Sequence, residues 1–394
     1  MTTFSVRFLG CKVSRVDAHE VRERLLADGH AESDDAEIAV VNTCCVTNEA
    51  LAKSRKEAAR AARTHRRVYV TGCGANLAAD AFAELPENVT VVARRSEETP
   101  GFIAGDVGAI GCVQADARLD RVRAFVKVQD GCSFSCNFCV VPLVRGGSRS
   151  RAADAVLAEI GRRVAQGHRE VVLTGINLGC YRDRAAGYDL PRLVREAGAL
   201  VERLRLSSIE INHVDDELVR ALRDTPTVAR HLHVPLQSGD DDVLRAMSRR
   251  YTVATYRRRL EPLREDFNLT SDVIVGFPDE DDRAFENTLA TARAVGLTKI
   301  HVFPYSPRPG TRTAGDDRVP AHVKRERGAR LRAASHEACL EHWRTKLGRE
   351  DAVLVDRPGR GYGDDYTPWL VDGEVGTFVR VRGRAVGDEG VVAA

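Results

Sequence analysis

The chain has 394 residues, of which 43% are hydrophobic and 29% are charged, a balance typical of a globular protein rather than a disordered or fibrous one. This length suits two or three domains of roughly 100 to 200 residues each. The formal net charge is only +2, so a polyanionic partner would have to bind a local basic patch. The sequence shows no signal-peptide core and no apolar run near the ~18 residues of a membrane span, which predicts a cytoplasmic protein without a membrane partner.

The ten cysteines of the chain indicate metal binding. Reducing cytosol keeps thiols free, so disulfides are not expected in an unsecreted protein. A secreted disulfide scaffold would also be short and crowded with cysteines, whereas these are scattered over a long chain.

The first hundred or so residues alternate short apolar runs with helical stretches, the pattern of strand-helix units around a parallel sheet. We therefore expect a small doubly wound α/β domain over residues 1–112. Its expected strands are residues 4–9, 38–41, 68–70 and 89–92, and its expected helices are residues 16–27 and 48–63.

A second series of six strand-helix units follows, and right-handed crossovers would curl it into a (βα)6 partial TIM-like barrel over residues 118–345. A functional site is expected at the carboxyl ends of its strands. Residues 346–394 contain short strands and many glycines and are expected to form a small β module. The expected barrel strands are residues 124–128, 171–174, 206–211, 231–234, 272–275 and 299–303.

Cys132, Cys136 and Cys139 form a CxxxCxxC motif directly after the first expected barrel strand. A cubane iron-sulfur cluster normally takes four soft thiolates, so three cysteines leave one iron open for another ligand. The spacing, with Phe138 directly before the third cysteine, resembles that of the radical S-adenosylmethionine superfamily. The alternative is a zinc knot, which needs four ligands and usually has paired CxxC spacing, and no histidine or fourth cysteine lies close by.

This resemblance implies that S-adenosylmethionine chelates the open iron and is cleaved to a 5′-deoxyadenosyl radical. It also implies that residues after the barrel strands contact the nucleotide, although a glycine after a strand is more often simply a turn. The segment holding Thr174 and Gly175 would meet the methionine amino group, and Glu210 and the Gln237-Ser238 pair would meet the ribose or the methionine. Gly276 and Phe138 would lie by the adenine.

Cys11, Cys44 and Cys73 each follow one of three strands of the first domain, in the phrases Leu-Gly-Cys, Asn-Thr-Cys and Thr-Gly-Cys. Parallel strands end at the same edge of a sheet, so the three thiols can converge on one crevice and hold a second cluster. Any one of them alone could equally be a buried free cysteine. The neighbouring Cys45 would point the other way and is expected to be structural. Three further cysteines lack such a setting and are expected to be inert: Cys112, Cys180 and Cys339.

With these motifs in place, the chain resembles the methylthiotransferases over about residues 4–345. The resemblance rests on phrases from both domains, which include Leu9-Gly-Cys-Lys-Val13, Val41-Asn-Thr-Cys44, Arg145-Gly146, Ser207-Ser-Ile-Glu210, Pro235-Leu-Gln-Ser-Gly239, Ser271-Asp-Val-Ile-Val-Gly-Phe-Pro278 and His301-Val-Phe-Pro-Tyr305.

The family resemblance implies two 4Fe-4S clusters and two molecules of S-adenosylmethionine, one methylating a sulfur and the other supplying the radical. The phrases Gly-Cys-Lys-Val and Ser-Ser-Ile-Glu look most like the branch that adds methylthio to C2 of N6-threonylcarbamoyladenosine at position 37, in the anticodon loop of tRNA. An electron donor such as flavodoxin or ferredoxin and a sulfur donor would be needed. The alternatives are another tRNA adenosine, a ribosomal-protein aspartate, or a non-catalytic, metal-stabilised RNA-binding protein.

Two segments are basic enough to meet RNA phosphates, residues 53–67 and the expected helix 318–346. An equally good interpretation of the first is a solvated helix face. The carboxyl-terminal module stands where relatives carry the RNA-binding TRAM barrel, but from Arg349 onward it is short and acidic, with six arginines, nine acids and a formal charge of −3. We therefore expect it to grip RNA by a local face, to contact the barrel, or to do neither.

Overall fold

The computed structural model describes residues 2–109 and 122–394, which form two compact units. The first comprises residues 2–109, 130–148 and 306–315, and the second comprises residues 122–129, 149–305 and 316–394. Cys112 lies outside the described residues. The division of the sequence into three domains at residues 112 and 345 stays a prediction. In the described ranges, no helix has the length and apolar composition that crossing a membrane requires.

The first unit contains a five-stranded parallel sheet in the order β2-β1-β3-β4-β5. Its strands are β1 (Thr3–Phe8), β2 (Ala31–Glu32), β3 (Ile38–Thr43), β4 (Arg67–Gly72) and β5 (Val89–Val91). Its helices are α1 (Lys12–Ala27), α2 (Asn48–Thr64), α3 (Cys73–Leu77), α4 (Thr99–Val107) and, in the segment 130–148, α5 (Val141–Arg145), with a 3-10 turn at Ala79–Phe82.

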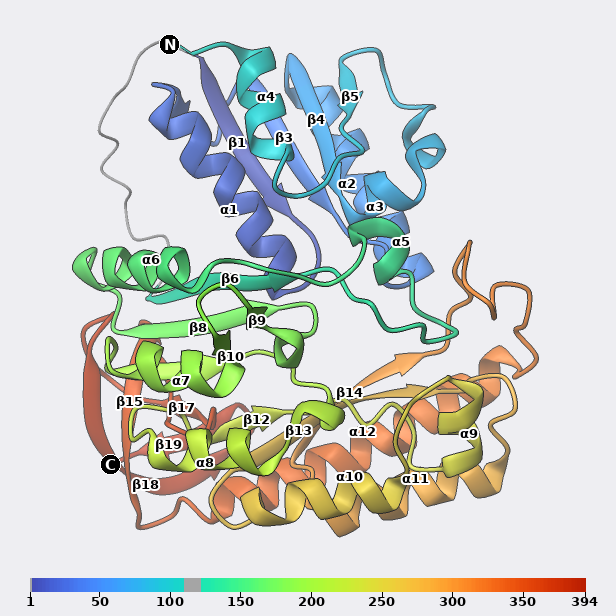
Figure 1. Cartoon of the computed structure of the whole chain (residues 1–394), viewed down its shortest axis with the longest axis vertical. Coiled ribbons are helices and arrows are strands. Elements are labelled where there is room, and N and C mark those ends of the chain that lie inside the picture. The colour runs from blue at the N-terminus through green and yellow to red at the C-terminus, as the bar shows by residue number, and fades with distance from the viewer. Residues whose placement is uncertain (1, 110–121) are drawn as a thin grey trace. The chain divides into compact units, whose positions relative to one another are not determined.

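Helices cover both faces of this sheet, as Figure 1 shows for α1 and α4 on one side and α2 on the other. The alternation of side chains along β3 explains the two layers: Ile38 and Val40 pack with α1 and α4, whereas Ala39 and Val41 pack with α2. The predicted doubly wound α/β arrangement is thus confirmed.

The second unit contains six parallel strands joined by helices, the predicted (βα)6 partial barrel. The strands are β6 (Arg123–Asp130), β8 (Glu170–Gly175), β11 (Arg203–Leu206), β12 (His231–His233), β13 (Asn268–Val275) and β14 (Lys299–Pro304), and short strands lie at β7 (Arg149–Ser150), β9 (Arg182–Asp183) and β10 (Tyr188–Asp189). The helices are α6 (Ala153–Ala165), α7 (Leu190–Gly198), α8 (Asp216–Asp224), α9 (Asp241–Ala246), α10 (Val253–Leu260), α11 (Asp282–Val295) and α12 (Ala321–Arg344), and 3-10 turns occur at Leu178–Cys180, Ile211–His213 and Glu261–Leu263.

The third barrel strand was wrongly placed by the sequence pattern. The apolar run suggested residues 206–211, but β11 is Arg203–Leu206, and the chain after it is irregular up to the 3-10 turn Ile211–His213. The charges of Arg203 and Arg205 argued against a buried strand at this place, because charged side chains are rarely buried unless they are paired. Here both side chains are almost fully buried beside Glu170.

The carboxyl-terminal module is a closed five-stranded barrel in the order β15-β16-β17-β19-β18. Its strands are β15 (Glu350–Arg357), β16 (Arg360–Tyr362), β17 (Pro368–Leu370), β18 (Phe378–Gly387) and β19 (Gly390–Ala393), coloured red in Figure 1. Trp369 is fully buried at its centre. The predicted short β module is confirmed.

This small barrel packs against the (βα)6 strands, one of the three possibilities left by its acidic sequence. Arg205 donates to the carbonyl oxygens of Gly363 at 2.7 Å and Asp364 at 3.0 Å. Arg123 donates to the Tyr366 hydroxyl at 2.9 Å. The arginines at the amino ends of the (βα)6 strands thus bind main-chain and aromatic groups of the module.

Glu170 balances the charge of this arginine cluster. Its side chain is fully buried, and its Oε1 lies 2.8 Å from Arg205 Nε and 3.9 Å from Arg123 Nε. We expect Glu170→Gln to lower the free energy of unfolding by about 3 to 5 kcal/mol, because it leaves buried guanidinium groups without their counter-charge.

Chemical denaturation measures this loss. The matched control is Glu202→Gln, which removes an exposed carboxylate paired with Arg169 and should cost less than about 1 kcal/mol. Equal losses for the two variants would contradict a structural role for Glu170.

Candidate functional site

Three cysteines lie at the carboxyl edge of the first unit's sheet. Cys11 precedes α1, Cys44 follows β3, and Cys73 is the first residue of α3, directly after β4. The connection from β1 runs toward β2, whereas those from β3 run toward β4 and β5, so the topological switch point lies between β1 and β3. Ligands of doubly wound sheets bind in the crevice at this point.

Two glycines allow the strand ends to approach each other. A Cβ on Gly10 would lie 2.8 Å from Ser14 Oγ and 3.4 Å from Cys44 Cβ, and a Cβ on Gly72 would lie 2.3 Å from Asn42 Oδ1. Both glycines have a positive φ, which other residues rarely adopt. The Gly-Cys phrases of the sequence therefore have a steric cause.

The charges of the three thiols act on one another. Burial raises the pKa of Cys44, and the charge of Cys11 raises it further. Burial also raises the pKa of Cys73 to about 11, with an opposing effect from Arg145 and a smaller raising effect from Cys11. The structure thus brings Cys11, Cys44 and Cys73 together, and such a set of soft thiols suits an iron-sulfur cluster.

Cys45 is buried in an apolar cluster with Val140 and Val144, and Cys73 packs against this cluster. Burial raises the pKa of the Cys45 thiol, and the charges of Cys73 and Cys44 raise it further. Cys45 thus lies near Cys73 as well as Cys44, and its structural role stays a prediction.

The CxxxCxxC segment forms a loop between β6 and α5. Gly131, with φ of 68°, begins the loop, and a Cβ there would lie 2.1 Å from the Gly147 carbonyl oxygen. The Cys132 amide donates to the Gly146 carbonyl at 3.0 Å, and the Phe134 amide points at the Cys132 sulfur at 3.4 Å. The Cys139 amide closes a turn on the Cys136 carbonyl at 3.1 Å. The loop is therefore tied at its base, and its three half-buried thiols and an amide aimed at sulfur fit a cluster site.

Arg145 binds groups from both cysteine segments of the first unit. Its guanidinium donates to Cys73 Sγ at 3.1 Å, to Asp130 Oδ1 at 3.0 Å and to Asp17 Oδ2 at 2.7 Å. Asp130 stands two residues before Cys132, and Asp17 belongs to α1, the helix that begins after Cys11. Sequence reasoning assigned Arg145 no role beyond its place in a motif, because residues 17, 73, 130 and 145 share no spacing rule.

Several predicted nucleotide contacts lie at the carboxyl ends of the (βα)6 strands in the second unit. Thr174 is fully buried, and its hydroxyl has no hydrogen-bond partner among the described residues. Gln237 has a φ of 65°, an uncommon conformation for a residue with a side chain, and such strain is typical of functional sites. Both observations are consistent with the predicted ligand contacts, which stay a prediction.

Gly175 and Gly276 are places of close approach in the same unit. A Cβ on Gly175 would lie 3.0 Å from Gln129 Oε1, and one on Gly276 would lie 2.4 Å from Lys324 Cγ. Glycine is thus required at Gly276, where φ is also 71°.

The other predicted nucleotide contacts are Glu210, Ser238 and Phe138, and each lies in a different environment. Burial raises the pKa of Glu210, whose carboxylate also accepts from Arg249 at 2.9 Å. Ser238 is fully buried, and its hydroxyl accepts from the Asp240 amide at 3.2 Å, which supports the loop before α9. Phe138 is half-buried in the cysteine loop of the first unit. Contact of these residues with a nucleotide stays a prediction.

The cations of the two predicted basic segments differ in burial and in their partners. In the second, Lys324 and Arg327 are buried and pair with Asp317 and Glu280, so they serve the fold of the second unit. In the first, five cations of α2 are exposed, and Lys53 and Arg55 among them pair with Glu49 and Glu84. The other three exposed cations are Lys56, Arg60 and Arg63.

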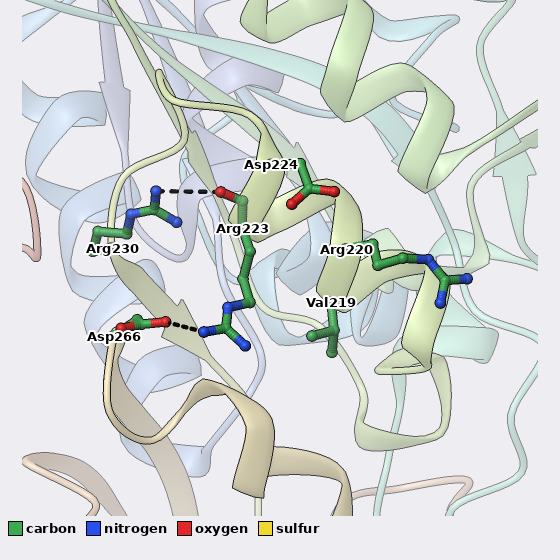
Figure 2. A pocket seen from close by; sticks show the side chains of 6 residues that line it. All are labelled: Val219, Arg220, Arg223, Asp224, Arg230 and Asp266. Carbon is green, nitrogen blue, oxygen red and sulfur yellow. Dashed lines mark hydrogen bonds and ion pairs between the residues drawn. The ribbon is translucent and has the colours of Figure 1, made fainter.

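A surface pocket of about 790 Å³ in the second unit holds none of the predicted site residues. Two of its charged side chains already bind neighbouring groups. Figure 2 shows that Arg223 donates to Asp266, at 2.7 Å, and that Arg230 donates to the Arg223 carbonyl. The lining residues are Val219, Arg220, Arg223, Asp224, Arg230 and Asp266.

Comparison with known families agrees with this geometry. Residues 126–292 match the Radical SAM superfamily, and residues 3–93 match a family described as Uncharacterized protein family UPF0004. The fold is similar to that of the radical S-adenosylmethionine methyltransferase TsrM from Kitasatospora setae, with a TM-score of 0.57, 14% identity and coverage of 80% of this chain and 77% of that chain. It is also similar to the cobalamin-dependent radical enzyme OxsB, with a TM-score of 0.51, 8% identity and coverage of 86% and 58%. The part of the chain that holds the cysteine loop and most of the barrel therefore matches the radical S-adenosylmethionine class.

Within the radical S-adenosylmethionine class, relatives that are similar over nearly the whole chain identify the family. The threonylcarbamoyladenosine tRNA methylthiotransferase MtaB of Thermotoga maritima is 32% identical, covering 100% of this chain and 97% of the relative. The protein of the same name from Bacillus subtilis is 34% identical, covering 87% and 82%. The chain belongs to the radical S-adenosylmethionine methylthiotransferase family.

Proposed function

We propose that this enzyme adds a methylthio group to C2 of N6-threonylcarbamoyladenosine at position 37 of tRNA, using two 4Fe-4S clusters and two molecules of S-adenosylmethionine. The observation that carries the proposal is the pair of three-cysteine sites in the first unit. One is built at the sheet's switch point and the other on the CxxxCxxC loop. Full-length similarity to enzymes named for this nucleoside supports the choice of substrate.

Each site has a separate task in this proposal. Cys132, Cys136 and Cys139 hold one cluster, which supplies radical chemistry when S-adenosylmethionine is bound to it. Cys11, Cys44 and Cys73 hold the second cluster, where the sulfur to be transferred is methylated. Arg145 keeps the Cys73 sulfur fixed and neutralises negative charge beside it.

We assign the nucleotide contacts of S-adenosylmethionine to residues at the strand ends and in the cysteine loop. The unpartnered Thr174 hydroxyl and the strained Gln237 backbone support this assignment. The full set is Phe138, Thr174, Gly175, Glu210, Gln237, Ser238 and Gly276.

The proposed partners follow from the reaction. The tRNA anticodon loop presents the adenosine, and the exposed cations of α2 offer contacts to its phosphates. A flavodoxin or ferredoxin supplies electrons, and a separate donor supplies sulfur. These partners place the enzyme in the cytoplasm.

Nucleoside mass spectrometry of tRNA tests the substrate. Cells that lack the gene are expected to lose methylthiolated threonylcarbamoyladenosine and to accumulate the unmodified threonylcarbamoyladenosine, and a plasmid copy should restore the modification. Persistence of the methylthiolated nucleoside, together with loss of methylthio from a different adenosine, would move the enzyme to another tRNA substrate. Unchanged tRNA and loss of methylthio from a ribosomal-protein aspartate would establish the protein substrate instead.

A further inference from the structure

The inner side of the (βα)6 strands is polar. Along β13, Leu269, Val273 and Val275 belong to the apolar core that the helices cover, so the alternate residues Thr270 and Asp272 face the inner side of the barrel. The same alternation places His231 and His233 of β12, and His301 of β14, on that inner side.

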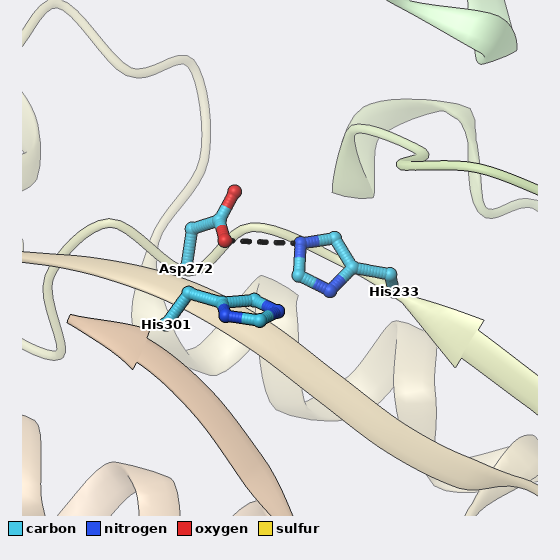
Figure 3. Close-up of side chains that lie close together, drawn as sticks. All are labelled: His233, Asp272 and His301. Atoms are coloured by element: carbon cyan, nitrogen blue, oxygen red, sulfur yellow. Dashed lines mark ion pairs between the residues drawn. The ribbon is translucent and has the colours of Figure 1, made fainter. Parts of the chain in front are cut away.

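Three of these inner side chains form a group of ligand type. His233, Asp272 and His301 each offer one nitrogen or oxygen atom, and these atoms all lie within 4.8 Å of one another. Figure 3 shows the two imidazoles and the carboxylate converging from three neighbouring strands. Asp272 and His301 are direct cross-strand partners, so the sheet itself fixes their spacing.

The distance between His233 and Asp272 suits a divalent transition-metal ion. Nitrogen and oxygen ligands bind zinc at about 2.0 to 2.1 Å, which places two ligands of a tetrahedral site about 3.3 Å apart. His233 Nε2 and Asp272 Oδ1 are 3.2 Å apart. The rings of His233 and His301 are also in contact, with centroids 5.7 Å apart, and a metal ion would account for both this contact and the His233–Asp272 distance.

The other nitrogen of His233 is held as in metal sites. Its Nδ1 lies 2.9 Å from the Thr270 hydroxyl oxygen, which lies 2.9 Å from His231 Nε2. If Nδ1 carries the proton and donates it to Thr270, the hydroxyl can donate in turn to His231, and the lone pair of His233 Nε2 is available to a metal. Metal-bound histidines are typically fixed through their second nitrogen in this way.

We propose that His233, Asp272 and His301 bind one divalent transition-metal ion of the zinc type inside the barrel of the second unit. Three protein ligands leave at least one position for water or for an oxygen atom of a bound substrate. The exposure of His301 and the partial exposure of Asp272 give the ion a route to the site. This inference concerns a group separate from the cysteine sites and does not depend on the proposed nucleoside substrate.

Metal analysis of the reconstituted holoenzyme tests the inference. With both clusters loaded, so that the cysteine thiols are engaged, the enzyme is incubated with zinc acetate, desalted and analysed by mass spectrometry for zinc and iron. We expect about one zinc per chain. His233→Ala and His301→Ala should lose this zinc and keep the iron, whereas the control His336→Ala, which removes an exposed histidine of α12, should keep both.

A matched pair at Thr270 tests the support of His233. Thr270→Val should weaken zinc binding about 10- to 100-fold, and Thr270→Ser, which keeps the hydroxyl, should not. Anomalous diffraction at the zinc edge from crystals of the unaltered enzyme provides a measurement that no variant's folding can affect. A peak among the three side chains supports the inference, and zinc content equal in all variants, or no peak at this position, overturns it.

Discussion

Cys73→Ala is expected to leave cleavage of S-adenosylmethionine intact and to abolish methylthio transfer to tRNA. Cys73 belongs to the site at the sheet's switch point, whereas the CxxxCxxC loop keeps its three thiols in this variant. Formation of 5′-deoxyadenosine, measured by chromatography with dithionite as reductant, reports on the loop. Mass spectrometry of the tRNA nucleosides reports on transfer.

Two further variants make this test specific. Cys136→Ala should abolish both activities, because it removes a thiol from the loop. Cys45→Ala is the matched control, since it removes a buried sulfur that lies next to Cys44 and near Cys73 but keeps every proposed ligand. It should retain both activities. Loss of 5′-deoxyadenosine formation in Cys73→Ala, with the loop's iron still present, would contradict separate tasks for the two sites.

The grouping of the cysteines could be predicted because each group follows from a simple rule of spacing or of sheet geometry. Cys132, Cys136 and Cys139 are close in sequence, so their spacing alone predicts a shared ligand. Cys11, Cys44 and Cys73 are far apart, but the ends of parallel strands meet at one edge, and the predicted strands were correct enough to bring them together.

The barrel strands were harder to predict where charged residues face inward. Arg203 and Arg205 belong to β11, yet their charge concealed the strand, because the neutralising Glu170 comes from β8 and the acceptors Gly363 and Asp364 come from the carboxyl-terminal module. The residue pattern of one segment contains no information about binding partners that lie far away in the sequence. The grouping of His233, Asp272 and His301 could not be predicted for the same reason, since only the pairing of β12, β13 and β14 brings them together.

Arg145 makes contacts that the sequence did not reveal. We expect its replacement to lower both the stability of the protein and its activity. Its side chain is 5% exposed and binds two carboxylates and the Cys73 sulfur. In Arg145→Met, Asp17 and Asp130 would remain buried without their counter-charge, which is expected to lower the free energy of unfolding by about 3 to 5 kcal/mol.

Near Cys73, we expect Arg145→Met to lose the proposed cluster at the switch point. Without Arg145, the Cys73 sulfur loses its charged hydrogen-bond donor, so a negatively charged cluster there would be less well stabilised. Iron and sulfide analysis should show the iron content of Arg145→Met falling toward that of Cys73→Ala. Electron paramagnetic resonance should still show the cluster of the CxxxCxxC loop.

Arg145→Lys separates charge from geometry. Lysine keeps the positive charge but cannot donate along the separate directions of a guanidinium group, so it should recover part of the stability without full methylthio transfer. Arg55→Met is the control for loss of an arginine as such, because its contact with Glu84 is long, at 3.5 Å, and exposed. If Arg145→Met keeps the iron content and transfer activity of the unaltered enzyme, Arg145 serves only to neutralise Asp17 and Asp130, and the sulfur at Cys73 is fixed by the strand end and by Gly72 alone.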